Sequence, residues 1–573
     1  MTAAILPTLP AARSVGSLED LRKDDADSEK GVLASTPLAR ESSPTSWIRQ
    51  HFTTSRSQSQ PDEIATQESV FDKPGATNTI SPKWEGLPFF DPDFRWTWRE
   101  ERSVTRIIDL RVTAWMCLCF FALHVDTSNI SSAVSGDMLP DLGLTTNDYN
   151  LGNTIFAIGF LVAEFPSQLV GKKVGADRWI PTLMCIWSVI AACQFWLAGK
   201  KSFLATRFLV GFAQGGFLPE CVIYFSYFYT KSELPLRLGL FWASASLCNI
   251  VTSFLAVGFL KVGLHGKEGW RWLYLFEGII SLVIGLAGYF ILVPGPAQTQ
   301  SRLFPKGWFS DDQNKIIVNK IIRDDPTKGD MHNREGLTLR TFIKALSDYD
   351  LYPLYSIGFL LAIPHQPAGT YLTQTLHKTL GFSTTKTNLL AIPPSVLGYM
   401  NTLFVAWLSE AVNSRWVAVA YINVWCLPFL ITLFVKPITH FANGWTAYAM
   451  SLLLVGAPGS VPLVVSWISR NSGSVGTRTV SASVYNIILH LQSIASANIY
   501  RDDDKPEYRR GNKQLMIICV ACIVQAPLCA LYYRFRNQQK ERQFAALPKE
   551  EQEAYSSTTA DTGLRRLDFR FAY

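Results

Sequence analysis

The chain has 573 residues, of which 48% are hydrophobic and 17% are charged, and it carries 17 Trp and 35 Phe. Soluble domains carry roughly 25% charged residues, so this composition favours a membrane protein. The net charge of +7 is small and dispersed, which excludes the concentrated basic face of a nucleic-acid-binding protein.

The first segment, 1–95, is rich in Ser, Thr, Pro and charged residues. It cannot bury enough apolar area to offset the cost of ordering, so we predict a disordered tail. Order is expected from about Trp96, where a charged helical segment leads into the first apolar run.

The apolar runs that follow have the length of membrane-spanning helices, since a hydrocarbon core of roughly 30 Å needs about 20 apolar residues. We predict an all-α membrane protein with twelve transmembrane helices in two six-helix bundles, 96–293 and 351–536. A polar central loop, 294–350, separates the bundles, and a polar tail, 537–573, follows them. The predicted spans are 111–133, 149–170, 179–198, 203–226, 238–260, 270–293, 351–372, 388–409, 416–435, 445–468, 478–499 and 514–534.

The charges of the short loops predict the orientation. The loop 136–150 contains Asp residues and no Lys or Arg, whereas the next loop contains Lys172, Lys173 and Arg178. By the positive-inside rule both termini are cytosolic. The loop 500–513 is basic and favours the opposite orientation, but we give the early loops more weight.

Few ionisable or strongly polar side chains fall inside the predicted spans, where they are costly and normally face the bundle interior or a water-filled path. Asp126 is the most informative, because an unpaired carboxylate at that depth takes up a proton. Alternation between a protonated and a paired state is what proton coupling requires. The other candidates are Asn129, Glu164, Arg207, Gln214, Glu277, Asn486 and His490.

Three of these residues have purely structural alternatives. Arg207 opens the fourth span and could extend its charge to the membrane interface. Glu277 could cap a helix or pair with Arg271 or another basic residue at a helix end, and we favour a structural role of this kind for it. His490 could be a packing residue rather than part of a cavity.

The motifs of common enzyme classes are absent from the sequence. It contains no GxxxxGK[ST] phosphate loop and no metalloprotease, hydrolase or kinase signature. We therefore expect no enzyme activity, no cofactor and no metal, and an ion gradient is the remaining common energy source. Cys519 and Cys522 form a CxxC, but they lie in a predicted span without a second pair, so we interpret them as buried apolar residues.

Several stretches resemble motifs of the major facilitator superfamily, specifically of the fungal anion:cation symporter group that includes the allantoate permeases. The stretch 125–130, VDTSNI, is similar to the LDRxNIG of that group, and 207–219 is similar to its RFLLGxxEAGFFP. The central stretches 323–330 and 348–353 resemble the allantoate permease branch. Further matches are 164–169, 172–175, 229–233, 269–272, 277–278, 381–384 and 387–390.

The resemblance implies a major facilitator fold and an alternating-access carrier for small organic anions, coupled to protons. Members of the group are associated with carboxylates such as allantoate, nicotinate and pantothenate. We expect a monomeric permease in the plasma membrane whose partners are its substrate, protons and lipid. The implied roles are anion binding by Arg207, proton coupling by Asp126, a polar cavity lined by Asn129, Gln214, Asn486 and His490, and gating by Glu164, Lys172 and Lys173.

Two departures from the group bear on mechanism. Thr127 stands where the group usually has Arg, and Gln214 stands where it usually has Glu. The chain therefore lacks one cation and one titratable site. An uncoupled facilitator and a nutrient sensor that transports little remain alternatives, and a membrane enzyme is the least favoured.

Overall fold

The computed structural model describes residues 61–67, 69, 72, 84–230, 233–262, 266–301, 304–324, 349–412, 414–472, 475–548, 552, 564, 566–567 and 569–573. Within these residues the chain is helical, and its β structure is limited to two isolated bridges, Ile64 with Thr97 and Gly295 with Gln298. Most of the tail that we predicted to be disordered, including 1–60, lies outside the described residues.

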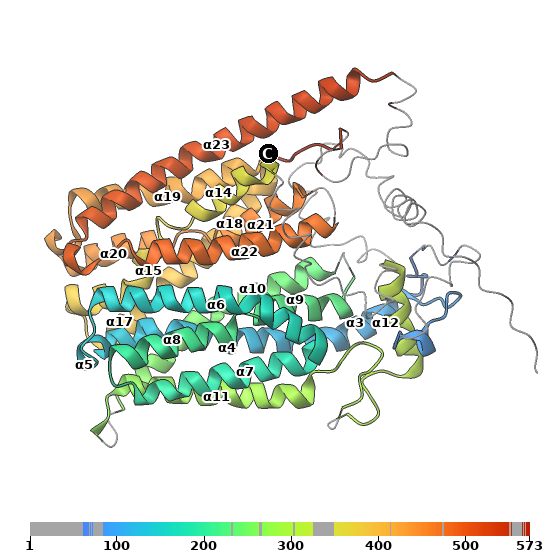
Figure 1. Ribbon diagram of the computed structural model, residues 1–573, viewed down its shortest axis with the longest axis horizontal. Helices are drawn as coiled ribbons and strands as arrows, with labels where there is room; N and C mark the ends of the chain where they lie inside the picture. Colours follow the sequence, from blue (N-terminus) through green and yellow to red (C-terminus); the bar gives the residue numbers. More distant parts are fainter. Residues whose placement is uncertain are drawn as a thin grey trace, which may run out of the picture.

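The helices form two bundles that lie side by side, with the first half of the chain in one and the second half in the other (Figure 1). The first bundle contains α4 (Ala114–Ser135), α5 (Met138–Asp141), α6 (Thr146–Val174), α7 (Ala176–Cys193), α8 (Lys200–Gln214), α9 (Phe217–Phe228), α10 (Leu234–Phe259) and α11 (Gly269–Ile291).

The second bundle is built from shorter pieces. It contains α14 (Tyr352–Leu360), α15 (Gln366–Thr370), α16 (Leu372–Gln374), α17 (Thr384–Leu390), α18 (Ile392–Ala411), α19 (Arg415–Val435), α20 (Gly444–Val455), α21 (Val461–Arg470), α22 (Val475–Ala497) and α23 (Arg509–Ala545). The helix α22 packs against α6, and α10 packs against α17 and α18, so these helices join the two bundles.

Over the described residues, nine helices are long and apolar enough to cross a membrane. The seventh predicted span is interrupted after α14, where Pro364 and Pro367 follow, and the tenth is divided between α20 and α21 at Pro458. Proline removes a helical hydrogen bond and clashes with the preceding turn, which explains both interruptions. The eleventh, α22, carries Asn486, His490 and Gln492. The count of twelve spans therefore stays a prediction.

The outer surface of the bundles is apolar, as expected for helices that face lipid. Val283 is 60% exposed and Leu528 is 56% exposed, and both lie in the middle of long helices. Water-soluble proteins rarely expose continuous apolar surface of this kind. The buried side chains inside the bundles are also mostly apolar, so the polar exceptions among them mark positions of interest.

Two short helices outside the bundles define one end of the molecule. The helix α3 (Trp98–Ile108) continues through a π-helical turn, η5 (Asp109–Thr113), into α4, and α12 (Asp311–Asp324) lies beside α3 in the central loop (Figure 1). We call this the linker end, and we call the opposite end, near α5 and α17, the far end.

Some described residues of 1–95 contact the helices that follow. The Ala65 amide donates to the Trp96 carbonyl at 2.8 Å, and the Trp98 amide donates to the Glu63 carbonyl at 3.1 Å. Arg323 of α12 forms an ion pair with Asp72 at 2.5 Å. These contacts supply the burial and the charge pairing that the composition of the tail alone does not reveal.

The last helix also continues further than predicted. We placed the end of the second bundle at Arg536, but α23 runs on to Ala545. The polar residues of its final turns therefore belong to a helix that extends beyond the predicted span.

Candidate functional site

Asp126 lies in the interior of the first bundle. Its side chain is completely buried, and its Oδ2 accepts a hydrogen bond from Trp187 Nε1 of α7 at 3.1 Å. The other oxygen, Oδ1, has no hydrogen-bond partner among the described residues. The carboxyl group therefore points from α4 toward α7 rather than toward the second bundle.

Glu277 of α11 is a second carboxyl group in the same interior. It is fully buried, neither of its oxygens has a hydrogen-bond partner within the described part of the chain, and it is close enough to Asp126 for the two charges to interact. The pair with Arg271, one of the structural alternatives that we favoured for Glu277, is not formed. Arg271 instead donates to Glu268 at 2.6 Å, and this hydrogen bond lowers the pKa of Glu268.

The geometry of α11 explains this correction. Arg271 and Glu277 are six residues apart, and at 3.6 residues per turn their side chains leave the helix on different faces. Arg271 turns to the far end and donates to the carbonyls of Phe195 and Leu197, each at 2.8 Å. Glu277 turns inward.

Arg207 of α8 is buried as well, being only 2% exposed, so its charge does not extend to the interface. Its Nη2 donates to Asn153 Oδ1 at 3.4 Å, and its guanidinium carbon lies 4.6 Å from the centre of the Phe156 ring. Among the described residues its Nε and Nη1 have no partner, and no carboxylate pairs with it. Within this part of the chain it is a buried cation without a countercharge.

Asn129 and Gln214 complete the polar interior of the first bundle. Both are fully buried, and the nitrogen and oxygen of each amide lack hydrogen-bond partners within the described residues. Counted from the far ends of α4, α8 and α11, Asn129, Arg207 and Glu277 lie at similar depths. Buried polar groups without partners are costly, and they indicate water or a ligand.

The remaining candidates meet where the bundles touch. Asn486 Nδ2 of α22 donates to Glu164 Oε1 of α6 at 2.7 Å. One turn further along α22, the His490 ring is stacked on Phe160, with 4.0 Å between the ring centres. The structure thus brings Glu164, Asn486 and His490 together, but apart from Asp126.

A further set of contacts joins the bundles at the far end. Asn150 Nδ2 donates to the Tyr500 carbonyl at 2.6 Å, and the Tyr371 hydroxyl donates to Asn150 Oδ1. Ser131 and Thr373 are hydrogen bonded through their hydroxyl oxygens at 2.9 Å. These residues were not predicted from the sequence, because uncharged hydroxyl and amide groups are common in loops and at helix ends.

Comparisons with known proteins agree with this architecture. A family model described as Major Facilitator Superfamily matches residues 116–497. The uncharacterized transporter YIL166C of Saccharomyces cerevisiae is 40% identical over 496 residues, which cover 86% of this chain and 91% of the relative. This chain belongs to the major facilitator superfamily.

More distant transporters match over a similar length. The major facilitator-type transporter hxnP of Emericella nidulans is 25% identical, with 78% of this chain and 88% of that protein covered. A bacterial homologue of the human lysosomal transporter Spinster, solved in an inward-facing and unoccupied conformation, aligns with a TM-score of 0.54 at 14% identity and covers 74% of this chain and 95% of its own. The chain is thus a multi-pass membrane transporter and not an enzyme.

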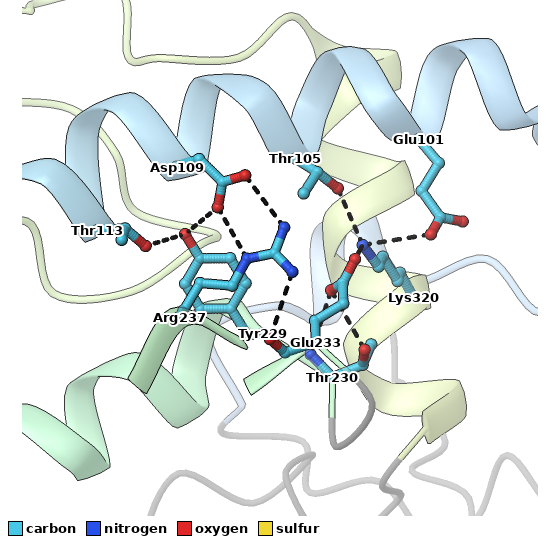
Figure 2. A network of polar contacts seen from close by, with 9 residues as sticks. All are labelled: Glu101, Thr105, Asp109, Thr113, Tyr229, Thr230, Glu233, Arg237 and Lys320. Carbon is cyan, nitrogen blue, oxygen red and sulfur yellow. Dashed lines mark hydrogen bonds and ion pairs between the residues drawn. The ribbon is translucent and has the colours of Figure 1, made fainter. Parts of the chain in front are cut away.

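At the linker end of this major facilitator protein, Lys320 joins three segments (Figure 2). Its Nζ lies 2.8 Å from Glu233 Oε1 and 3.3 Å from Glu101 Oε1, and it donates to Thr105 Oγ1 at 3.1 Å. All three charged side chains are nearly buried, with exposures of 6% for the lysine and 4% for each glutamate. The central loop is therefore fastened to α3 and to the turn before α10.

Beside it, Arg237 of α10 binds Asp109 through two parallel hydrogen bonds (Figure 2). Arg237 Nε and Nη2 each donate to a different oxygen of Asp109 at 3.0 Å. The Tyr229 hydroxyl donates to Asp109 Oδ1 at 2.8 Å and is also hydrogen bonded to Thr113. This two-pronged geometry is the strong form of an arginine–carboxylate contact.

The basic residues predicted to act as gates lie near the end of α6. Lys173 is exposed, two residues before Gly175, and the Lys172 side chain lies outside the described part of the structure. Neither residue belongs to the Lys320 network.

Proposed function

We propose that this transporter is a permease that takes up a small organic anion by proton symport. The carried molecule would be a carboxylate of the allantoate, nicotinate or pantothenate kind. Alternating access would move it through a cavity between the two bundles. Both termini would face the cytosol, and the protein would act as a monomer in the plasma membrane.

The buried, unpaired guanidinium of Arg207 carries this proposal. A cation removed from water is costly unless an opposite charge accompanies it. Within the described residues that charge is missing, while Asn153 and Phe156 hold the group from one side. A carboxylate substrate would supply two acceptor oxygens in the plane of the guanidinium, which is the pairing that Arg favours.

Asp126 is the proposed proton carrier, with Glu277 next to it. Two carboxyl groups that interact in a site of low polarity cannot both stay ionised at low cost, so the binding of a proton by one of them is favoured. A proton taken up from one side and released on the other would couple transport to the gradient. Asn129 and Gln214 would supply further amide groups in the interior of the same bundle.

The contacts between the bundles support an alternating mechanism. Hydrogen bonds such as Asn150 to Tyr500 join the far end, whereas the Asn486–Glu164 pair lies further toward the linker end. Opening either side requires the local set of bonds to break. Glu164 would therefore contribute to the gate of the linker end, with Lys172 and Lys173 nearby.

The proposal is tested by uptake of radiolabelled allantoate, nicotinate, pantothenate and biotin into cells that lack their own permeases. Uptake is measured at acid and neutral pH, with and without a protonophore. Uptake of one acid that collapses with the protonophore is the expected result. If uptake depends on neither pH nor the protonophore, the protein is a facilitator and not a proton symporter. If the acid binds without net flux, the protein is a sensor and not a transporter.

Single substitutions then test the two roles. Arg207→Gln should raise the KM for the anion by at least about tenfold, which is the effect of losing a charged hydrogen bond, and Arg207→Lys should restore it only in part. Asp126→Asn should abolish accumulation against a gradient while preserving exchange. Arg178→Gln and Asp311→Asn change exposed charges and serve as matched controls. Full uphill uptake by Asp126→Asn would remove the proton role.

A further inference from the structure

The last residues of the chain return to the linker end of the second bundle. Residues 569–573, Phe-Arg-Phe-Ala-Tyr, are not helical and lie against α21 and α23. Phe571 is 2% exposed and Leu564 is also 2% exposed, and both belong to the apolar core that contains Trp467 and Tyr533.

Two asparagines bind the main chain of this segment in the same way. Asn537 of α23 accepts from the Phe571 amide at 2.8 Å and donates to the Phe571 carbonyl at 2.9 Å. Asn471, at the end of α21, accepts from the Ala572 amide at 2.8 Å and donates to the Ala572 carbonyl at 3.1 Å. Each side-chain amide thus makes, with one residue of the segment, the two hydrogen bonds that a neighbouring β-strand would make with it.

Side chains complete the enclosure. Trp467 Nε1 donates to the Ala572 carbonyl at 2.8 Å, and the Tyr533 ring stacks on Phe571 with 5.0 Å between ring centres. Lys540 is 3% exposed; its Nζ donates to the carbonyls of Leu564 and Arg566 and lies 5.0 Å from the centre of the Phe571 ring.

We propose that the surface formed by Trp467, Asn471, Tyr533, Asn537 and Lys540, which we call the groove, is a peptide-binding site and that its resident ligand is the segment 569–573. The asparagines recognise an extended main chain, the pocket between Tyr533 and Trp467 accepts an aromatic side chain, and Lys540 binds carbonyl groups upstream. The ligand class is an extended peptide with an aromatic residue followed by a small one.

The arrangement has the features of reversible binding. The segment is covalently attached, so its effective concentration at the groove is on the order of millimolar. Its contacts are hydrogen bonds and the burial of two apolar side chains, Leu564 and Phe571, without a disulfide among the described cysteines. A free peptide of the same chemistry would therefore compete weakly with the resident segment and bind well once that segment is removed.

The test uses a variant that ends at Gly563 and a fluorescein-labelled synthetic peptide of residues 564–573. Fluorescence polarisation should show saturable binding to the truncated protein, with affinity at least about tenfold weaker for the full-length protein and for a peptide carrying Phe571→Asp. Equal binding to both proteins would overturn the proposal. So would no binding to a truncated protein that melts at the temperature of the full-length protein.

If the truncated variant does not fold, a measurement on the full chain tests the proposed site. Amide hydrogen exchange followed by mass spectrometry should show protection of residues 569–573. The double variant Asn471→Ala/Asn537→Ala should lose that protection by at least about tenfold in exchange rate, whereas Gln538→Ala, an exposed neighbour, should keep it. An unprotected segment in the full-length protein would disprove the site. These readouts do not depend on transport, so they stand apart from the proposed function.

Discussion

At the residue scale, Lys320 is the common partner of two buried acids. It balances Glu101 and Glu233, two side chains that are each 4% exposed, at the meeting point of the central loop with the first bundle. Burial of charged groups is tolerated only when they are paired, and removal of one partner leaves the others without compensation.

We expect Lys320→Met to destabilise the protein by roughly 3–5 kcal/mol, because two carboxylates lose their common cation. The measurement is a thermal melt followed by Trp fluorescence in detergent. Adding Glu101→Gln and Glu233→Gln to Lys320→Met should restore much of the loss. Lys306→Met, at an exposed position of the same loop, is the control; an equal shift in that variant would argue against the network.

Other residues show where sequence reasoning stops. The depth of Asp126, Arg207 and Glu277 in the membrane follows from their place within apolar runs, and all three lie inside the first bundle. The surroundings of the Glu277 side chain could not be predicted from the sequence, because they depend on which helices pack against α11. The Lys320 network was missed for a similar reason, since its partners are far apart in the chain.

At the element scale, the close contact between α6 and α8 depends on glycine. A Cβ atom on Gly211 would lie 2.2 Å from the Phe156 carbonyl oxygen, and one on Gly159 would lie 2.6 Å from the Phe208 carbonyl oxygen. Small residues of this kind let helix backbones approach each other closely within a membrane. Van der Waals packing, rather than the hydrophobic effect, holds helices together there.

Gly211→Leu should therefore separate α6 from α8 and lower stability by at least about 1–3 kcal/mol, as for overpacked cores. It should also displace Arg207, which lies one turn earlier in α8. The thermal melt and the yield of monodisperse protein report the effect. Gly258→Leu in α10 introduces the same side chain where no atom lies within 4 Å, and it should melt like the unmodified protein. If both variants melted alike, close packing would not be the cause.

The helices themselves were largely predictable, because a run of about 20 apolar residues has few alternatives in a bilayer. The predicted span 416–435 corresponds to α19, Arg415–Val435, and 270–293 corresponds to α11, Gly269–Ile291. The interruption after α14 was not foreseen, although its prolines are visible in the sequence. The helix α12 was also missed, because a polar segment gives no hydropathy signal.

At the scale of the whole molecule, some contacts between the bundles must break during transport. Ser131 and Thr373 belong to different bundles and are hydrogen bonded at the far end. If the two sides open alternately, this pair must separate in every cycle.

A disulfide between Ser131→Cys and Thr373→Cys, introduced in a background without the ten native cysteines, should form readily and block uptake. A reducing agent should restore uptake. The control pair, Ser356→Cys with Gln525→Cys, replaces residues within the second bundle whose side chains are hydrogen bonded at 2.7 Å, and its oxidation should leave uptake intact. Unimpaired uptake by the oxidised first pair would rule out opening at the far end.

The attachment of α12 to the first bundle also determines where the polypeptide can be divided. A gene cut after Asp324 would leave α12 and Lys320 on the amino-terminal fragment, together with the glutamates that neutralise this lysine. A cut after Pro294 would transfer that lysine to the other fragment. Co-expression of the first pair of fragments should reconstitute a functional protein more efficiently than co-expression of the second, because α12 belongs structurally to the first half of the chain.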